Sequence, residues 1–142
     1  MNKPNIVIDT NVLYAALRSK HGASSKLLSL VGTGLFEIHL SVPLVLEYED
    51  VLLRESTSIT FSKEVVFDLI DSLCALGHPH EIHFLWRPYL RDPNDEFVLE
   101  IAVASQSGYI ITYNLDDFTG IDEFGIKAMT PKAFLQEIGV IS

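Results

Sequence analysis

Apolar runs alternate along most of the chain with stretches in which apolar residues recur every three or four positions. Continuous or alternating apolar runs are typical of strands, whereas the 3.6-residue period is typical of helices. The pattern predicts five strands, at residues 5–8, 36–40, 81–85, 109–112 and 126–129. It predicts helices at residues 12–17, 24–31, 43–54, 63–76, from 93 or 95 to 108, and 131–138. Because strands and helices alternate, we expect an α/β domain with a mostly parallel sheet.

Local signals support the ends of several predicted helices. Pro43 and Pro131 fall in first turns, where the missing N–H of proline costs nothing. Thr130 is a good N-cap for the last helix, and Gly77 follows the fourth. We expect a three-layer sandwich in which a central, mostly parallel five-stranded sheet is flanked by helices. The two helices within residues 41–76 form a pair beside that sheet.

The length of 142 residues fits one domain, covering residues 1–142, and no internal repeat or low-complexity linker interrupts it. The only cysteine, Cys74, has no partner in the chain, and its apolar neighbours predict a buried, inert thiol. No uncharged apolar run reaches the ~18 residues of a membrane span, and the N-terminus lacks the features of a signal peptide. We therefore expect a cytoplasmic protein without membrane contact.

The chain is acidic, with 19 acidic against 10 basic residues and a formal charge of −9. This balance argues against a protein that holds nucleic acid mainly through a basic surface. Any role on nucleic acid must therefore tolerate a deficit of positive charge.

Four acidic positions are predicted to meet at one edge of the sheet. Asp9 directly follows the first strand, and Asp117 follows the fourth. Glu47 borders the buried face of the helix after the second strand, and Asp95 begins the helix before the fourth. Because parallel strands end on the same edge, and ligands bind at that edge in open α/β sheets, these side chains can share one cleft.

Such a cluster needs a counter-charge. Two carboxylates about 4 Å apart repel by ~4 kcal/mol at an effective dielectric constant of 20, and three would repel by ~12 kcal/mol. Domain stabilities are only ~5 to 15 kcal/mol, so protonation or a divalent cation is required. Oxygen ligands favour Mg²⁺ or Mn²⁺ over zinc. His78, His80 and His83 are interpreted as loop or edge histidines rather than metal ligands.

Each acid also has a purely structural interpretation. Asp92 precedes a proline and suits an N-cap, and Asp95 at the third helical position suits the helix dipole. Glu47 can be a solvated helix residue, and Asp117 can cap a turn. Asp9 can form an Asx-turn, but the buried strand before it delivers it to the ligand-binding edge, so its structural interpretation is the weakest.

Four stretches, in this order and spacing, resemble the PIN-domain ribonucleases over residues 5–138: "IVIDTNVLYAAL", "LVLEYEDVL", "RDPNDEFVLEIAVASQSGYIITYNLDDF" and "TPKAFL". Within that family the sequence is similar to the VapC-like toxin components of toxin–antitoxin systems. The resemblance implies an endoribonuclease that cleaves single-stranded or structured RNA with Mg²⁺ or Mn²⁺ bound to acidic residues. It also implies an antitoxin protein as partner, a homodimer, and products with 5′-phosphate and 3′-hydroxyl ends.

By the same resemblance, Asp9, Glu47 and Asp95 are the first three motif acids. They would bind the metal and carry catalysis together with Asp117, the acid of the "DF" pair. Asn114 departs from the family pattern, since many relatives have an acid at this position, so metal binding would either be weaker or rely on Asp117.

Other positions of these motifs are supporting ones. Thr10 and Asn11 match the small polar residues that brace the first aspartate. In the third motif Asp92, Asp95 and Glu96 compete for the same role, and the helix register decides between them. We favour Asp95.

Two other functions fit parts of the sequence. A phosphatase of the haloacid dehalogenase type would use Asp9 as nucleophile, but Asn11 stands where its general acid is needed. A protein with the same fold but little or no catalysis would act by binding a partner. Asn114 and the acidic composition motivate this second alternative.

Overall fold

The computed structural model describes residues 3–57, 60–82, 90 and 93–142. Its strands are β1 (Asn5–Ile8), β2 (Glu37–Ser41), β3 (His78–His80), β4 (Tyr109–Ile111) and β5 (Lys127–Met129). Its helices are α1 (Thr10–Arg18), α2 (Ala23–Ser29), α3 (Val42–Glu55), α4 (Lys63–Leu76), α5 (Pro93–Ala104) and α6 (Pro131–Glu137). Two short 3₁₀ helices, η1 (Leu115–Phe118) and η2 (Ile121–Phe124), follow β4.

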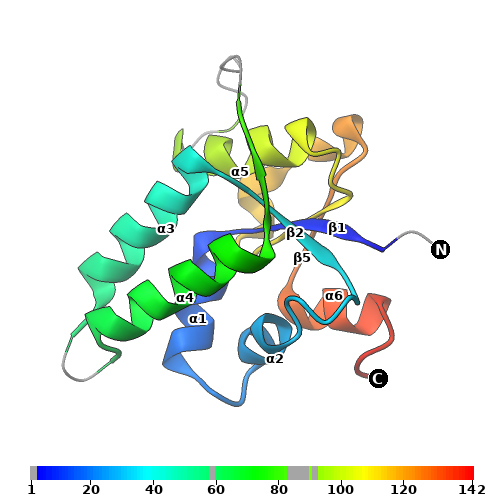
Figure 1. Ribbon diagram of the computed structural model, residues 1–142. Coiled ribbons are helices and arrows are strands. Elements are labelled where there is room, and N and C mark those ends of the chain that lie inside the picture. Colours follow the sequence, from blue (N-terminus) through cyan, green and yellow to red (C-terminus); the bar gives the residue numbers. More distant parts are fainter. Residues whose placement is uncertain (1–2, 58–59, 83–89, 91–92) are drawn as a thin grey trace.

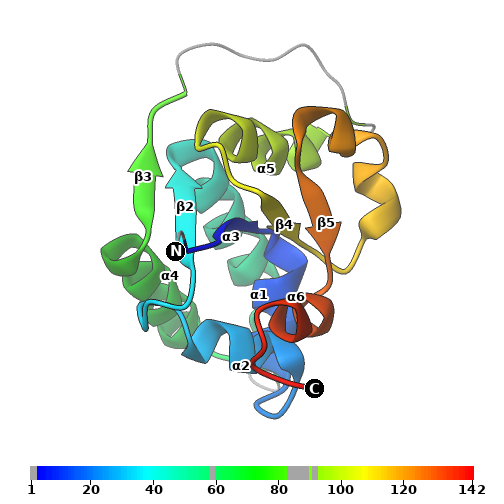
Figure 2. The same cartoon turned by 90° about the vertical axis from the view of Figure 1, so that its right-hand side faces the viewer.

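All strand pairs in the five-stranded sheet are parallel, and the strand order is β3-β2-β1-β4-β5. Helix α5 lies on one face, whereas α1, α2 and α6 lie on the other (Figures 1 and 2). Helices α3 and α4 pack against each other near β2 and β3. The predicted α/β sandwich with a parallel sheet is therefore confirmed. In the described part of the chain, no helix has both the length and the hydropathy needed to span a bilayer.

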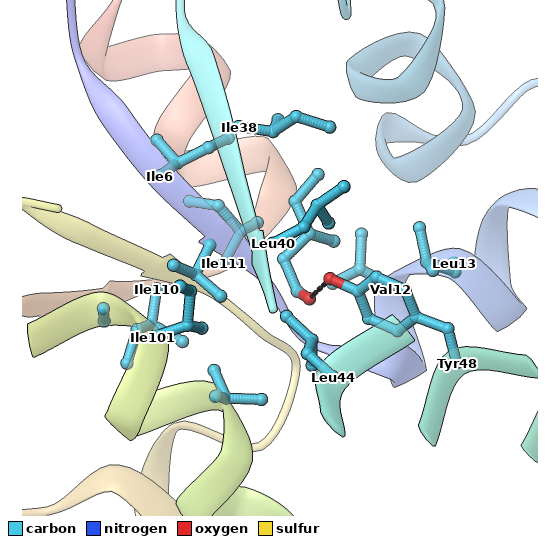
Figure 3. Packing of buried hydrophobic residues seen from close by; sticks show 14 of the residues in the cluster. Ile6, Val12, Leu13, Ile38, Leu40, Leu44, Tyr48, Ile101, Ile110 and Ile111 are labelled. Atoms are coloured by element: carbon cyan, nitrogen blue, oxygen red, sulfur yellow. Dashed lines mark hydrogen bonds between the residues drawn. The ribbon is translucent and has the colours of Figure 1, made fainter. Parts of the chain in front are cut away.

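The core is built around β1, which is covered on both faces. Ile6 and Val7 are fully buried and Ile8 is nearly so, which explains the continuous apolar run of this strand. Helix α3 contributes apolar residues one turn apart, and the buried Tyr48 among them donates a hydrogen bond to the backbone carbonyl of Ile8 (Figure 3). This bond ties α3 to the carboxyl end of the central strand.

Two helices begin as the sequence predicts. The Thr130 hydroxyl accepts a 3.1 Å hydrogen bond from the backbone N–H of Ala133, so it caps α6. Helix α3 begins one residue before Pro43, and the Ser41 hydroxyl accepts a 3.3 Å hydrogen bond from the N–H of Leu44. In both helices the proline occupies the first turn, where no intrahelical N–H is needed.

The third strand was predicted at residues 81–85, and this prediction is wrong. The strand is His78–His80, directly after α4, and residues 81–82 belong to no strand. The remaining predicted residues, 83–85, lie outside the described part of the chain. The alternation of "EIHFL" is a local signal, but β3 is defined by its parallel pairing with β2, in which His78 lies beside His39. His78 and His80 consequently lie on an edge strand of the sheet, as one of the two interpretations had it, and not in a loop.

The prediction of a buried Cys74 is also wrong, because the residue is exposed. Helix α4 buries Val66, Ile70 and Leu73, which repeat every three to four positions. Cys74 follows this stripe by one residue, a rotation of about 100° around the helix. Local hydrophobicity therefore did not decide its burial; its position on the helical wheel did.

Candidate active site

Asp9 stands at the carboxyl end of the central strand with its side chain held in place. Its own N–H donates a 2.9 Å hydrogen bond to the carbonyl of Ile111, so the backbone continues the ladder with β4 for one residue beyond β1. The Asp9 carboxylate caps α1 by accepting a 2.8 Å hydrogen bond from the N–H of Thr10. The residue is 7% exposed. A largely buried, oriented carboxylate thus lies at the ligand-binding edge of the sheet.

Two polar side chains hold the second oxygen of this carboxylate. Thr112 Oγ1 donates a 2.8 Å hydrogen bond to Asp9 Oδ2, and Asn11 Nδ2 donates one of 3.2 Å. Thr112 is fully buried. It lies beside Asp9 because the preceding residues, Ile8 and Ile111, are register partners in the sheet. Thr112 was not among the predicted site residues, although it carries a hydroxyl at the end of the predicted strand that neighbours β1.

The same network continues into the segment after β4. Asn11 Oδ1 accepts a 3.1 Å hydrogen bond from the N–H of Tyr113, and the N–H of Asn114 donates one of 3.0 Å to Thr112 Oγ1. Thr112 therefore accepts from one backbone group while it donates to Asp9. The loop after β4 is therefore fixed relative to Asp9 through the side chains of Asn11, on α1, and of Thr112.

The charge of Asp117 acts on the Asp9 carboxyl. Burial raises the pKa of the Asp9 carboxyl, the negative charge of Asp117 raises this pKa further, and the hydrogen bonds from Thr112, Thr10 and Asn11 oppose the shift. Asp117 is exposed in η1. The fold thus keeps a carboxyl group where its ionised form is unfavourable, and a bound cation would relieve this.

Asp117 lines an open hollow of ≈ 430 Å³. The hollow is lined by the five consecutive residues that follow Thr112, namely Tyr113, Asn114, Leu115, Asp116 and Asp117. The segment after β4 therefore provides both Asp117 and a surface on which a ligand could rest.

Glu47 is half-buried on α3, next to the residue that anchors this helix. Tyr48 donates its hydrogen bond to the carbonyl of Ile8, which directly precedes Asp9. Burial raises the pKa of Tyr48, and the charge of Asp9 adds to this shift, so the phenol lies within electrostatic reach of the carboxylate. The turn of α3 that carries Glu47, the second motif acid, therefore lies close to the end of β1, where Asp9, the first motif acid, stands.

Three acids of α5 are buried: Asp95, Glu96 and Glu100 are 8%, 8% and 6% exposed. Glu96 Oε1 accepts a hydrogen bond from the backbone N–H of Leu90, so this side chain ties α5 to the segment before it. Burial raises the pKa of Glu100, and the charge of Glu96 adds to the shift. Of the three competitors in this motif, Glu96 has a structural partner, Asp92 lies outside the described residues, and Asp95 occupies the first helical turn.

Across residues 3–57, 60–82, 90 and 93–142, no three His, Cys, Asp or Glu side chains are arranged to hold a metal ion together. The structure brings Asp9 and Asp117 within electrostatic reach, and it places Glu47 and Asp95 on α3 and α5, which pack against each other. The donor chemistry is that of carboxylates, which suits Mg²⁺ or Mn²⁺ rather than zinc. Asp9 and Asp117 thus fit a hard cation in donor type and in charge.

Comparison with known proteins gives the family. The model of the PIN domain matches residues 5–116. A solved structure of VapBC2 from Rickettsia felis, bound to a DNA fragment from their promoter, is similar with a TM-score of 0.62 and 17% sequence identity. The match covers 88% of this chain and 98% of that one, and identity this low shows a shared fold alone. None of the curated proteins matches. Because the family model spans most of the chain, Asp9, Glu47 and Asp95 included, this protein belongs to the PIN-domain family.

Proposed function

We propose that this protein is a metal-dependent endoribonuclease that hydrolyses phosphodiester bonds of RNA. The observation that carries the proposal is the buried, hydrogen-bonded carboxylate of Asp9 beside the charge of Asp117 at the carboxyl edge of the sheet. In a PIN-domain chain, this is a position suited to a divalent cation and, through it, to a phosphate group.

The side chains have separate roles in this proposal. Asp9 and Asp95 hold the principal Mg²⁺ or Mn²⁺, and Glu47 or Asp117 orients the attacking water. The backbone N–H of Thr10 and the side chains of Asn11 and Thr112 keep the Asp9 carboxylate in one orientation through their hydrogen bonds to it. The bound cation supplies Lewis acidity, which activates water and offsets negative charge on the phosphate.

Asn114 has a different role in this site. It contributes a neutral amide where a fourth carboxylate would add a further negative charge beside Asp117. The Asn114 backbone is already fixed by its 3.0 Å hydrogen bond to Thr112. The charge on this side of the hollow therefore comes from Asp116 and Asp117, of which Asp117 acts on the Asp9 carboxyl.

The net charge of −9 is compatible with an RNA substrate. Part of that charge belongs to the acids that would bind metal, and a bound divalent cation converts an acidic site into a phosphate receptor. The affinity for RNA then depends on the metal ion rather than on a basic surface.

The direct test is to incubate the purified protein with mixed RNA in Mn²⁺ or in EDTA. We expect cleavage only with Mn²⁺, products with 5′-phosphate and 3′-hydroxyl ends, and loss of cleavage in Asp9→Asn and Asp95→Asn. Asp68→Asn is the matched control, because Asp68 is an exposed acid on α4. Cleavage that persists in EDTA or in both site variants would contradict the proposal.

We also propose that the protein acts in the cytoplasm as the toxin of a toxin–antitoxin pair and forms a homodimer. The shared fold with VapBC2 of Rickettsia felis and the PIN-domain membership support this. Light scattering after size exclusion, with and without the protein encoded by the adjacent gene, measures both assemblies. A monomer whose mass does not change on mixing would contradict this part of the proposal.

A second candidate function is partner binding with little or no catalysis. It is favoured by the neutral Asn114 and by the finding that the described residues contain no ready group of three metal ligands. Titration calorimetry with Mn²⁺ distinguishes the two functions. Equally weak binding by the unsubstituted protein and by Asp9→Asn favours this candidate. Trapping of an aspartyl-phosphate on Asp9 would instead favour the phosphatase.

A further inference from the structure

Tyr113 is an exposed aromatic residue next to the residues that hold Asp9. It is 45% exposed and lines the hollow after β4. In the sequence it stands between Thr112, which is buried, and Asn114, which is exposed. An aromatic ring of this exposure leaves much apolar surface in contact with water, which a ligand could cover. Nothing in the roles assigned above uses this ring.

Tyr113 is held at both its backbone and its hydroxyl group. Its phenol oxygen shares a hydrogen bond with the hydroxyl of Ser24, which is 2% exposed on α2. Its backbone N–H donates a 3.1 Å hydrogen bond to Asn11 Oδ1, and Asn11 also contacts the Asp9 carboxylate. Because the hydroxyl is engaged with a buried residue, the ring is the part left to meet a ligand. A ring fixed in this way loses little conformational entropy on binding.

The remainder of the hollow indicates what kind of ligand would use this ring. Leu115, 43% exposed, adds a second apolar side chain, and Asn114 between the two can donate and accept hydrogen bonds. Asp116 and Asp117 make the hollow negative, so an unaccompanied phosphate is disfavoured there. A flat, uncharged, hydrogen-bonding group fits these surroundings better, and an unpaired nucleobase is such a group.

We propose that Tyr113 is a stacking platform for one unpaired nucleobase of the RNA, close to the phosphodiester that is cleaved. This inference rests on the proposed nuclease function and adds to it a residue that positions the substrate. Bases in a duplex are already stacked on their neighbours, whereas a base in a single strand is free to stack on an aromatic side chain. Tyr113 thereby favours single-stranded regions of RNA as the substrate.

The test compares Tyr113→Ala and Tyr113→Phe with the unsubstituted protein. Phe67→Ala is the matched control, since Phe67 is an aromatic residue on α4 with the same exposure of 45%. Two readouts are needed: steady-state cleavage of a single-stranded RNA oligonucleotide with Mn²⁺, and binding to each variant, also with Mn²⁺, of a labelled oligonucleotide of the same sequence whose linkages resist cleavage. The Phe variant retains the ring and loses only the hydrogen bond to Ser24, so it separates stacking from local stability.

We expect Tyr113→Ala to weaken binding and raise KM by about 5-fold to 150-fold with little change in kcat. Tyr113→Phe and Phe67→Ala should stay within about 2-fold of the unsubstituted protein. Oligonucleotides with one abasic position give a second measurement. One abasic position near the cleaved bond should weaken RNA binding by the unsubstituted protein. It should cause no further loss of binding in Tyr113→Ala, because the two changes remove the same contact.

The outcomes separate this inference from the function on which it rests. If the unsubstituted protein cleaves RNA with Mn²⁺ but Tyr113→Ala binds and cleaves as it does, the stacking platform is wrong and the nuclease proposal stands. The platform is also wrong if Phe67→Ala weakens RNA binding as much as Tyr113→Ala does. It is wrong as well if every abasic position weakens binding equally in the unsubstituted protein and in Tyr113→Ala. If the unsubstituted protein neither binds nor cleaves RNA, the nuclease proposal fails and the platform fails with it.

Discussion

The hydroxyl of Thr112 donates a 2.8 Å hydrogen bond to the carboxylate of Asp9 across 103 positions of sequence. The contact exists because β1 and β4 are neighbouring parallel strands that end side by side. In metal sites, groups that orient a ligating side chain are often needed for activity although they never touch the metal. Thr112 is such a positioning residue in the proposed site.

Replacing Thr112 by valine keeps its shape and removes the donor to Asp9. We expect a loss of roughly 10-fold to 100-fold in Mn²⁺ affinity or in cleavage, the size seen when such orienting groups are removed. We also expect the free energy of unfolding to fall by about 1 to 3 kcal/mol, because buried partners of the hydroxyl lose a hydrogen bond. Thr112→Ser keeps the hydroxyl and should restore most of the metal affinity. Equal metal titrations for the valine and serine variants would contradict a positioning role.

Asp9→Asn should stabilise the metal-free protein while it abolishes the response to metal. The folded state raises the pKa of Asp9, so this group favours folding when protonated and opposes folding once the pH rises above that pKa. Asparagine is neutral at all pH values and is as good an N-cap as aspartate. In EDTA at pH 7.5 we expect a Tm at or above that of the unsubstituted protein. Added Mn²⁺ should then raise the Tm of the unsubstituted protein only.

A lower Tm of Asp9→Asn in EDTA would show that the hydrogen bonds to the Asp9 carboxylate stabilise the fold by more than its buried charge destabilises it. An equal response of both proteins to Mn²⁺ would show that Asp9 does not bind the metal. Differential scanning fluorimetry with and without the ion gives both results from one set of samples.

The protein should lose stability in mild acid through His39. This residue of β2 is 8% exposed, and its ring forms hydrogen bonds of 2.8 Å with His80 and 2.9 Å with Asn5 Oδ1. Since Asn5 Oδ1 can only accept, we infer that His39 Nε2 donates to it and that His39 Nδ1 accepts from His80. Burial, then the charges of His80 and His78, lower the pKa of His39 from 6.5 to about 4. A protonated His39 would place two donors face to face.

The sign of this effect follows from the lowered pKa. Below about pH 6.5 the unfolded chain binds a proton at His39 that the folded chain rejects, so the free energy of unfolding falls as the pH drops toward 4. The contribution of this one group is at most about 3 kcal/mol. Urea denaturation at pH 7.5, 6, 5 and 4.5 should show a smaller decline for His39→Gln than for the unsubstituted protein. Parallel declines in the two proteins would assign the acid sensitivity to other groups.

Gly77 should not tolerate a methyl group. A Cβ at this position would lie 2.7 Å from Leu40 Cδ1 and 2.8 Å from the Leu73 carbonyl oxygen, in the place where α4 ends against β2. We expect Gly77→Ala to lower the free energy of unfolding by about 1 to 3 kcal/mol, the usual cost of overpacking. Gly108→Ala is the matched control, because a Cβ there meets nothing within 4 Å. Gly108→Ala should change stability by less than about 1 kcal/mol. Equal urea midpoints for the two variants would contradict the steric explanation.

Much of this fold could be predicted because its signals are local. The buried run of β1, the cap at Thr130 and the stripe of apolar residues on α4 each depend on neighbours a few positions away. The position of Asp9 followed in the same way, because a polar residue directly after a buried strand must stand at the carboxyl end of that strand. The sequence by itself therefore determined the order of the elements, the parallel α/β class and the edge of the sheet that carries the candidate site.

Tertiary structure alone decided which side chains meet. The pairing of β3 with β2 moved the third strand to His78–His80 and created the contact between His39 and His80. The pairing of β1 with β4 brought Thr112 to Asp9. These contacts join segments far apart in the chain, and their formation depends on sheet register and packing, which no local pattern of hydrophobic residues specifies.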